Sequence, residues 1–275
     1  MAIPPFLLGD RRYLEANARR HAQTVHLAEG TVLCRVLAKY LMFVDPHDLG
    51  VTPRLCLDGY WESWITGVVA RSVPPGGWCV DIGANHGYYT LIMADAVGRQ
   101  GRVLAVEPNP LLSELLALSV EVNGLRTQTT IVQKAVTDGR TPRVRLVVPS
   151  RRGACATICR DATAADQVVD VDAASVDELT AEWPQVDLVK VDAEGAEDLI
   201  WRGMRRTIEQ NPGLAVLLEF VPSRYRDPCG FVREIQVAGF SLREVGYDSE
   251  IVPVSEAVLI QGDEDAGRML FLRRE

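Results

Sequence analysis

The chain has 275 residues, of which 47% are hydrophobic and 24% charged, and its formal net charge at pH 7 is −8. This composition is typical of a globular protein, and no apolar run approaches the ~18 residues that span a bilayer, so we expect no membrane partner. The Lys and Arg residues are scattered, which argues against nucleic-acid binding. The six cysteines form no Cys-x-x-Cys pair and are expected to be reduced thiols in a cytoplasmic protein.

The first 75 residues differ in pattern from the rest of the chain. Apolar side chains at roughly helical spacing predict that Tyr13 to Tyr40 is mostly helical. A turn at Asp45 to Gly50 and a segment rich in large side chains follow, and Pro74 to Gly77 marks a boundary. We therefore expect residues 1–75 to form an N-terminal, mostly helical cap or lid over a main domain at 76–275.

From Trp78 onward, apolar strands alternate with helices. This alternation predicts an α/β fold with a parallel sheet covered by helices on both faces. Residues 151–174 are polar and rich in Asp and Ala, so we expect a variable loop there. The expected strands are 79–82, 103–107, 129–132, 186–192, 214–220, 240–245, 257–260 and 269–272, with 144–148 extended. The expected helices are 88–97, 111–122 and 194–209.

The stretch VDIGANHG, from Val80 to Gly87, places two glycines in a strand-to-helix turn. Gly83 and Gly87 allow positive backbone angles and close approach of a ligand, and Glu107 at the end of the next strand suits a ribose diol. Their G-x-x-x-G spacing differs from the patterns that bind diphosphates. S-adenosylmethionine fits such a site because it has a ribose and an adenine but no phosphate. The alternative is a tight connection without a ligand.

Four acidic residues stand at or near the ends of separate expected strands: Asp81, Glu107, Asp192 and Glu219. The carboxyl ends of parallel strands meet at one rim, where ligands bind in open α/β sheets. An acid at a strand end can also cap the following helix. Four of them together favour a binding site.

Five motifs carry a family resemblance: VDIGANHGYYT (80–90), AVEPNP (105–110), KAVTD (134–138), KVDAEGAE (190–197) and LLEF (217–220). Between Trp61 and Phe220 the chain resembles the FkbM family of S-adenosylmethionine-dependent methyltransferases, most specifically in KVDAEGAE. The resemblance implies a Rossmann-like seven-stranded methyltransferase sheet with a reversed last strand. It also implies O-methylation of a hydroxyl on a natural product such as a polyketide or a sugar.

The resemblance further implies which residues contact the cofactor. Asp81, Gly83, Asn85 and Gly87 would line its methionine end, and Glu107 would hold the ribose hydroxyls. The turn at 133–135 would border adenine, although Lys134 replaces the short acidic or amide side chain of many related enzymes. The implied cofactor-binding set is Glu62, Asp81, Gly83, Asn85, Gly87, Tyr88, Glu107, Pro108, Asn109, Gln133 and Ala135. Tyr88 has the alternative of being a core residue.

Transfer to an alcohol needs a base, or a metal that lowers the pKa of the hydroxyl. Asp192 is the first candidate for either role and Glu219 the second. Together they could hold magnesium, although we expect no required metal. His86, inside the glycine turn, is a third candidate base or a space-filling residue. Glu197 is expected to be solvated at a helix N-terminus.

Other functions stay open from the sequence. N- or carboxyl-methylation of a small molecule or peptide would use the same cofactor site. A nicotinamide-dependent oxidoreductase should show a dinucleotide glycine pattern and a catalytic tyrosine-lysine or histidine pair, neither of which we find. A non-catalytic nucleoside-binding module would not need the acidic rim. We expect a small-molecule acceptor as partner, and a homodimer is compatible with the sequence.

Overall fold

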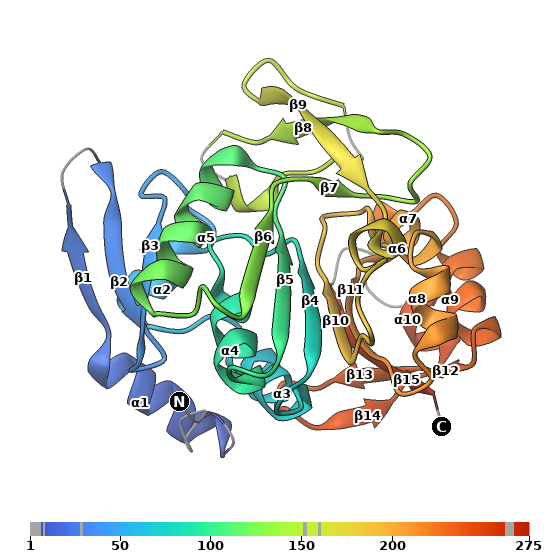
Figure 1. Cartoon of the computed structure of the whole chain (residues 1–275), viewed down its shortest axis with the longest axis horizontal. Coiled ribbons are helices and arrows are strands. Elements are labelled where there is room, and N and C mark those ends of the chain that lie inside the picture. Colours follow the sequence, from blue (N-terminus) through green and yellow to red (C-terminus); the bar gives the residue numbers. More distant parts are fainter. Residues whose placement is uncertain are drawn as a thin grey trace.

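The computed structural model describes residues 7, 9–27, 30–150, 153–158, 161–261 and 267–274 (Figure 1). The strands of its central sheet are β4 (Trp78–Ile82), β5 (Arg102–Val106), β6 (Thr129–Val132), β10 (Leu188–Val191), β11 (Ala215–Phe220), β12 (Phe240–Ser241), β13 (Arg243–Val245), β14 (Ile251–Pro253) and β15 (Arg268–Arg274). Within the described residues they form a nine-stranded sheet in the order β14-β13-β15-β11-β10-β4-β5-β6, and β12 pairs with β15.

The strand directions confirm the predicted fold class. β6, β5, β4, β10 and β11 are parallel to one another, and β15 lies antiparallel between β11 and β13. The series β6-β5-β4-β10-β11-β15-β13 is therefore a Rossmann-like methyltransferase sheet with a reversed last strand. The short β14 extends it at the edge beyond β13.

Alternate residues of each strand point to opposite faces, as the period of two requires. Cys79 and Val103 join the core on one face, while Val80 and Leu104 join the core on the other. Helices α3 (Ser63–Ser72), α4 (Tyr88–Val97) and α5 (Pro110–Val122) cover the first face. The second face is covered by α6 (Val176–Leu179), α7 (Glu197–Arg202), α8 (Arg205–Gln210), α9 (Pro228–Val237) and α10 (Glu256–Gln261).

The N-terminal segment contains a small sheet that we did not expect. Its elements are α1 (Arg11–His21), β1 (Gln23–His26), β2 (Val32–Val36), β3 (Tyr40–Val44) and α2 (Thr52–Leu57). The expectation of helix from Tyr13 to Tyr40 is thus correct as far as His21 and wrong beyond it. β1, β2 and β3 form an antiparallel sheet, in blue in Figure 1. β2 and β3 alternate between buried and half-buried residues, which is the period of a strand.

Three further expectations need correction. The helix expected at 194–209 is two helices, α7 and α8, separated at Gly203 and Met204. The strand expected at 257–260 is part of α10, in which Leu259 is buried while Val258 is exposed. The loop expected at 151–174 contains β9 (Gln167–Ala174), which pairs with β8 (Arg143–Val148) and β7 (Ala135–Val136). Residues 151, 152, 159 and 160 of that stretch lie outside the described chain.

The helices of the described chain are too short or too polar to span a bilayer. The division into a cap at 1–75 and a domain at 76–275 stays a prediction.

Candidate active site

The carboxyl ends of β4, β5, β10 and β11 border one cavity that is open to the surface. Three of the four strand-end acids, Glu107, Asp192 and Glu219, line this cavity. The fourth, Asp81, is fully buried next to it, since the parallel register sets Asp81 beside Lys190 of β10. The folded chain therefore brings together acids that are up to 138 positions apart in the sequence.

The turn between β4 and α4 requires glycine for a reason that the sequence did not show. Gly83 has φ +70°, and a Cβ there would lie 1.8 Å from the carbonyl oxygen of Asp192. Gly87 has φ +96°, and a Cβ there would lie 2.4 Å from Leu116 Cδ1. Both glycines thus allow the turn to pack against neighbouring protein, rather than only against a ligand. The turn is held in contact with the end of β10.

Glu107 is aimed by two backbone groups. Its Oε2 accepts a hydrogen bond from Asn85 N at 2.8 Å, and its Oε1 accepts one from Asn109 N at 2.9 Å. The residue is only 4% exposed. Burial raises the pKa of Glu107 to about 7, although the two N–H groups oppose this shift. A buried carboxylate with both oxygens oriented at the wall of a cavity is suited to accept hydrogen bonds from a diol.

Lys190 is a site residue that the sequence analysis missed. Its Nζ lies 3.2 Å from Asp192 Oδ2 and 3.9 Å from Asp81 Oδ1, and the side chain is 1% exposed while lining the cavity. Burial disfavours the charged ammonium, but Asp192 and Asp81 hold the pKa of Lys190 above its usual value. Thr90 Oγ1 donates to Asp81 at 2.5 Å. The available signal was a lysine inside the apolar strand LVKV.

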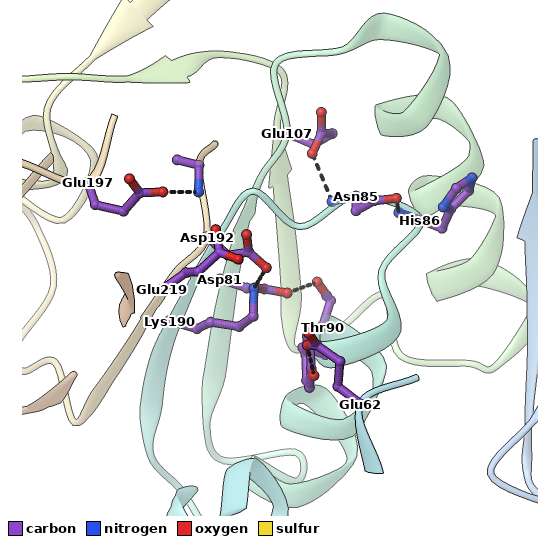
Figure 2. Close-up of polar contacts among 12 residues, drawn as sticks. Glu62, Asp81, Asn85, His86, Thr90, Glu107, Lys190, Asp192, Glu197 and Glu219 are labelled. Atoms are coloured by element: carbon purple, nitrogen blue, oxygen red, sulfur yellow. Dashed lines mark hydrogen bonds and ion pairs between the residues drawn. The ribbon is translucent and has the colours of Figure 1, made fainter. Parts of the chain in front are cut away.

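Three more carboxylates line the cavity with Asp192, namely Glu62, Glu194 and Glu219. Figure 2 shows Glu62 and Glu219. Glu62 accepts a hydrogen bond from the Tyr89 hydroxyl at 2.9 Å. Arg224, in the short helix η4 (Pro222–Arg224), pairs with Glu194 at 2.9 Å and with Glu219 at 2.7 Å. Burial and the charge of Asp192 raise the pKa of Glu62 and of Glu194 to about 7, and they raise the pKa of Glu219 above its usual range.

His86 lines the cavity but is directed toward the N-terminal segment. Its Nε2 accepts a hydrogen bond from Asp45 N at 3.1 Å, and in Figure 2 the imidazole lies beyond Asn85 as seen from Asp192. Burial lowers the pKa of His86 to about 4, so the ring is neutral at pH 7. With Nε2 already engaged, His86 is less well placed than the carboxylates to take a proton, and its catalytic role stays a prediction.

Glu197 is buried, so our expectation of a solvated side chain is wrong. Its carboxylate accepts hydrogen bonds from Ala193 N at 2.9 Å, from Gly195 N at 3.1 Å and from the Tyr225 hydroxyl at 3.0 Å. The loop after β10 turns its N–H groups inward, which gives Glu197 these partners at 0% exposure. Glu197 therefore holds the loop that carries Glu194.

The cavity includes most of the expected site residues. Those that line it are Glu62, Gly83, Asn85, His86, Tyr88, Glu107, Pro108, Ala135, Asp192 and Glu219. Gly87 and Asn109 shape the turn and the start of α5 without lining it, and Gln133 is exposed, whereas its neighbour Lys134 lines the cavity. In the described chain, no group of three or more His, Cys, Asp or Glu side chains is arranged to hold a metal ion.

The fold and the cavity define a Rossmann-like protein with a site at the carboxyl ends of its parallel strands. Residues 81–248 match the family model described as the methyltransferase FkbM domain. Because this match covers more than half of the chain, the protein belongs to the FkbM methyltransferase family. No curated protein sequence is significantly similar to it.

Three solved structures are similar to the chain at low sequence identity. A putative O-methyltransferase from Klebsiella pneumoniae is 12% identical, with 100% of this chain and 92% of that chain covered and a TM-score of 0.45. A putative rRNA-methylase from Clostridium thermocellum is 11% identical, with 75% and 90% covered and a TM-score of 0.45. Fibrillarin from Aeropyrum pernix, solved with natively bound S-adenosyl-L-methionine, is 13% identical, with 91% and 97% covered and a TM-score of 0.45.

Proposed function

We propose that this protein is an S-adenosylmethionine-dependent O-methyltransferase that acts on a hydroxyl group of a small natural product or sugar. The observation that supports it most directly is the pair of backbone hydrogen bonds that orient Glu107 at the cavity wall, beside the glycine turn. In a methyltransferase family, a cavity of this kind is the place for the cofactor.

The residues present fit the nucleoside part of this cofactor. Each Glu107 oxygen already accepts one N–H and keeps acceptor capacity for a ribose hydroxyl. Pro108 and Lys134 to Val136 would border the adenine, and the turn at Gly83 to Asn85 would border the methionine end. Because Lys134 stands where many related enzymes have a short acidic or amide side chain, adenine would be recognised by backbone groups and apolar contacts.

When bound, S-adenosylmethionine supplies an electrophilic methyl group, and its bond to sulfur breaks as the acceptor oxygen bonds to the methyl carbon. A hydroxyl acceptor loses its proton in this reaction, so a base must lie close by. We assign this role to Asp192, which Lys190 orients at 3.2 Å, and secondly to Glu219. Most of the remaining rate acceleration comes from alignment of the acceptor in the cavity.

The carboxylates that line the cavity also favour a hydroxyl acceptor over a carboxylate or an amine acceptor. A carboxylate acceptor would be repelled by Asp192 and its neighbours. An amine acceptor would be kept protonated by them, and a protonated amine is not a nucleophile. Neither difficulty affects a neutral alcohol.

Isothermal titration calorimetry tests the cofactor assignment. We expect micromolar binding of S-adenosylmethionine and of its demethylated product S-adenosylhomocysteine, and no binding of nicotinamide cofactors. Glu107→Gln should weaken binding by ~1–3 kcal/mol, the scale for a hydrogen bond to a charged group. Glu114→Gln, at an exposed position of α5, is the matched control and should bind normally. Absence of heat with both sulfur compounds on the folded protein would reject the proposal.

A further inference from the structure

The cavity has two ends of different chemistry. Glu107, Pro108 and Lys134 belong to the end assigned to the nucleoside. Another part of the lining, the acidic wall, presents four carboxylates from separate parts of the chain, and in Figure 2 Glu62, Asp192 and Glu219 lie below Glu107, around Lys190. The four wall carboxylates are Glu62, Asp192, Glu194 and Glu219.

The cations near this wall are too few to balance it. Lys190 is shared between Asp192 and the buried Asp81, and Arg224 is shared between Glu194 and Glu219. Glu62 accepts its hydrogen bond from a neutral tyrosine hydroxyl. Carboxylates that are withdrawn from water without full compensation are costly, so this wall favours any positive charge that enters the cavity.

Aromatic rings among the lining residues are a separate observation that also favours a cation. Trp61, Tyr88 and Tyr89 line the cavity. The Tyr89 ring already has a cation over it, since Lys190 Nζ lies 4.9 Å from the ring centroid. Carboxylates combined with aromatic faces are the usual means of recognising an ammonium group.

The proposed cofactor supplies only part of the missing charge. S-adenosylmethionine carries a sulfonium, while its amino and carboxyl groups cancel, so its net charge is one positive unit. The described cations and this unit together still fall short of the wall carboxylates and Asp81. Burial raises the pKa of Glu62, Glu194 and Glu219, so protons neutralise part of this wall, and an ammonium group on the acceptor can take the place of such a proton.

Resting on the function proposed above, we propose that the methyl acceptor is a hydroxylated molecule that also carries a protonated amine, such as an amino sugar or an aminocyclitol. Glu194 and Glu219 bind the ammonium, and the neighbouring hydroxyl faces Asp192. The amine keeps its proton and stays unmethylated, while the hydroxyl oxygen gains the methyl group and loses its proton to the carboxylate. The cofactor sulfur retains the electron pair of the broken bond.

Matched pairs of probes test this proposal on the full-length protein saturated with S-adenosylhomocysteine. We would compare glucosamine with glucose, and trans-2-aminocyclohexanol with trans-1,2-cyclohexanediol, by ligand-observed NMR and calorimetry at pH 7.5. The aminated member of each pair should bind at least ~10-fold more tightly, the factor expected for a charged hydrogen bond. Calorimetry in buffers of different ionisation enthalpy should also show proton release, because the incoming cation lowers the pKa of Glu62 and Glu194 from about 7.

The double variant Glu194→Gln/Glu219→Gln should remove this preference, while Glu209→Gln, at an exposed position of α8, should keep it. Equal affinity within the pairs, or no binding of any probe to protein that binds S-adenosylhomocysteine normally, would overturn the proposal. Failure of the cofactor itself to bind would instead reject the methyltransferase assignment, so the two outcomes are distinguishable.

Discussion

Glu107 combines burial with a position at the wall of the cavity, which makes cofactor affinity depend on pH. Burial raises the pKa of Glu107 to about 7, whereas binding of a ribose diol favours the ionised carboxylate. Below pH 7 the proton must be lost on binding, so the affinity for S-adenosylhomocysteine should rise by up to ~10-fold per pH unit toward pH 7 and level off above it. Calorimetry between pH 5.5 and 8.5 measures this.

The variant Glu107→Gln provides the control for that profile. It cannot ionise, so the remaining pH dependence reports the other groups of the cavity, among them Glu62 and Glu194. If the parent protein and Glu107→Gln give profiles of the same slope, Glu107 does not exchange a proton on binding.

Asp192 is the second residue whose role can be tested directly. Asp192→Asn keeps the size of the side chain and loses its basicity, so turnover on the acceptor should fall by ~10²-fold or more. Cofactor affinity should change little, because the contact with Gly83 is made by the backbone carbonyl of Asp192. Activity unaffected by EDTA would favour a base over a magnesium ligand. Near-full turnover of the variant would transfer the role to Glu219.

At the scale of elements, the turn from β4 to α4 depends on its contact with the end of β10. Gly83→Ala would add a Cβ 1.8 Å from the Asp192 carbonyl oxygen, in addition to the strain of φ +70°. Gly124→Ala is a matched control, since Gly124 has φ +68° and nothing within 4 Å of the added carbon. We expect the control to cost ~1–2 kcal/mol of unfolding free energy from backbone strain alone. Gly83→Ala should cost a further ~1–3 kcal/mol from overpacking.

Urea unfolding and cofactor titration of both variants distinguish the effect of backbone strain from the effect of the contact between the added Cβ and Asp192. Cofactor binding should be lost in Gly83→Ala, because the turn must move away from β10, and kept in Gly124→Ala. Equal unfolding free energies of the two variants would show that the turn accommodates the added Cβ without loss of stability.

At the scale of the whole molecule, the N-terminal elements and the central sheet share one core. Tyr40 and Met42 of β3 belong to the same cluster of buried side chains as Leu91 of α4. Tyr40 also donates a hydrogen bond to the buried Asp95 of α4 at 2.9 Å. The backbone of β3 is hydrogen-bonded to α5 as well, since Phe43 N donates to Ser119 Oγ at 3.0 Å.

This shared core predicts that the protein unfolds in a single cooperative transition. Tryptophan fluorescence, to which Trp61 and Trp64 of the N-terminal segment contribute, should change together with far-UV circular dichroism during urea unfolding. Two separated transitions would instead show that residues 1–75 fold as an independent cap. The same measurement on Tyr40→Phe, which removes only the hydroxyl, tests whether a single cooperative transition depends on the hydrogen bond to Asp95.

The α/β class, the glycine turn and the acids at the strand ends all follow from the order of residues along the chain. These features depend on local rules: continuously apolar strands alternate with helices, glycines mark a turn of special geometry, and the ends of parallel strands share one rim. Because such rules act within a few residues, the sequence sufficed to place Glu107 and Asp192 at the rim, and both line the cavity.

The partners of these residues, in contrast, depend on how distant segments pack. Lys190 interrupts an apolar strand in the sequence, and only the parallel register sets it between Asp81 and Asp192. Glu197 was expected in solvent, but the loop after β10 buries it, and His86 faces Asp45 from the N-terminal segment. Burial and charge pairing depend on groups far apart in the sequence, so the local pattern of residues does not contain them.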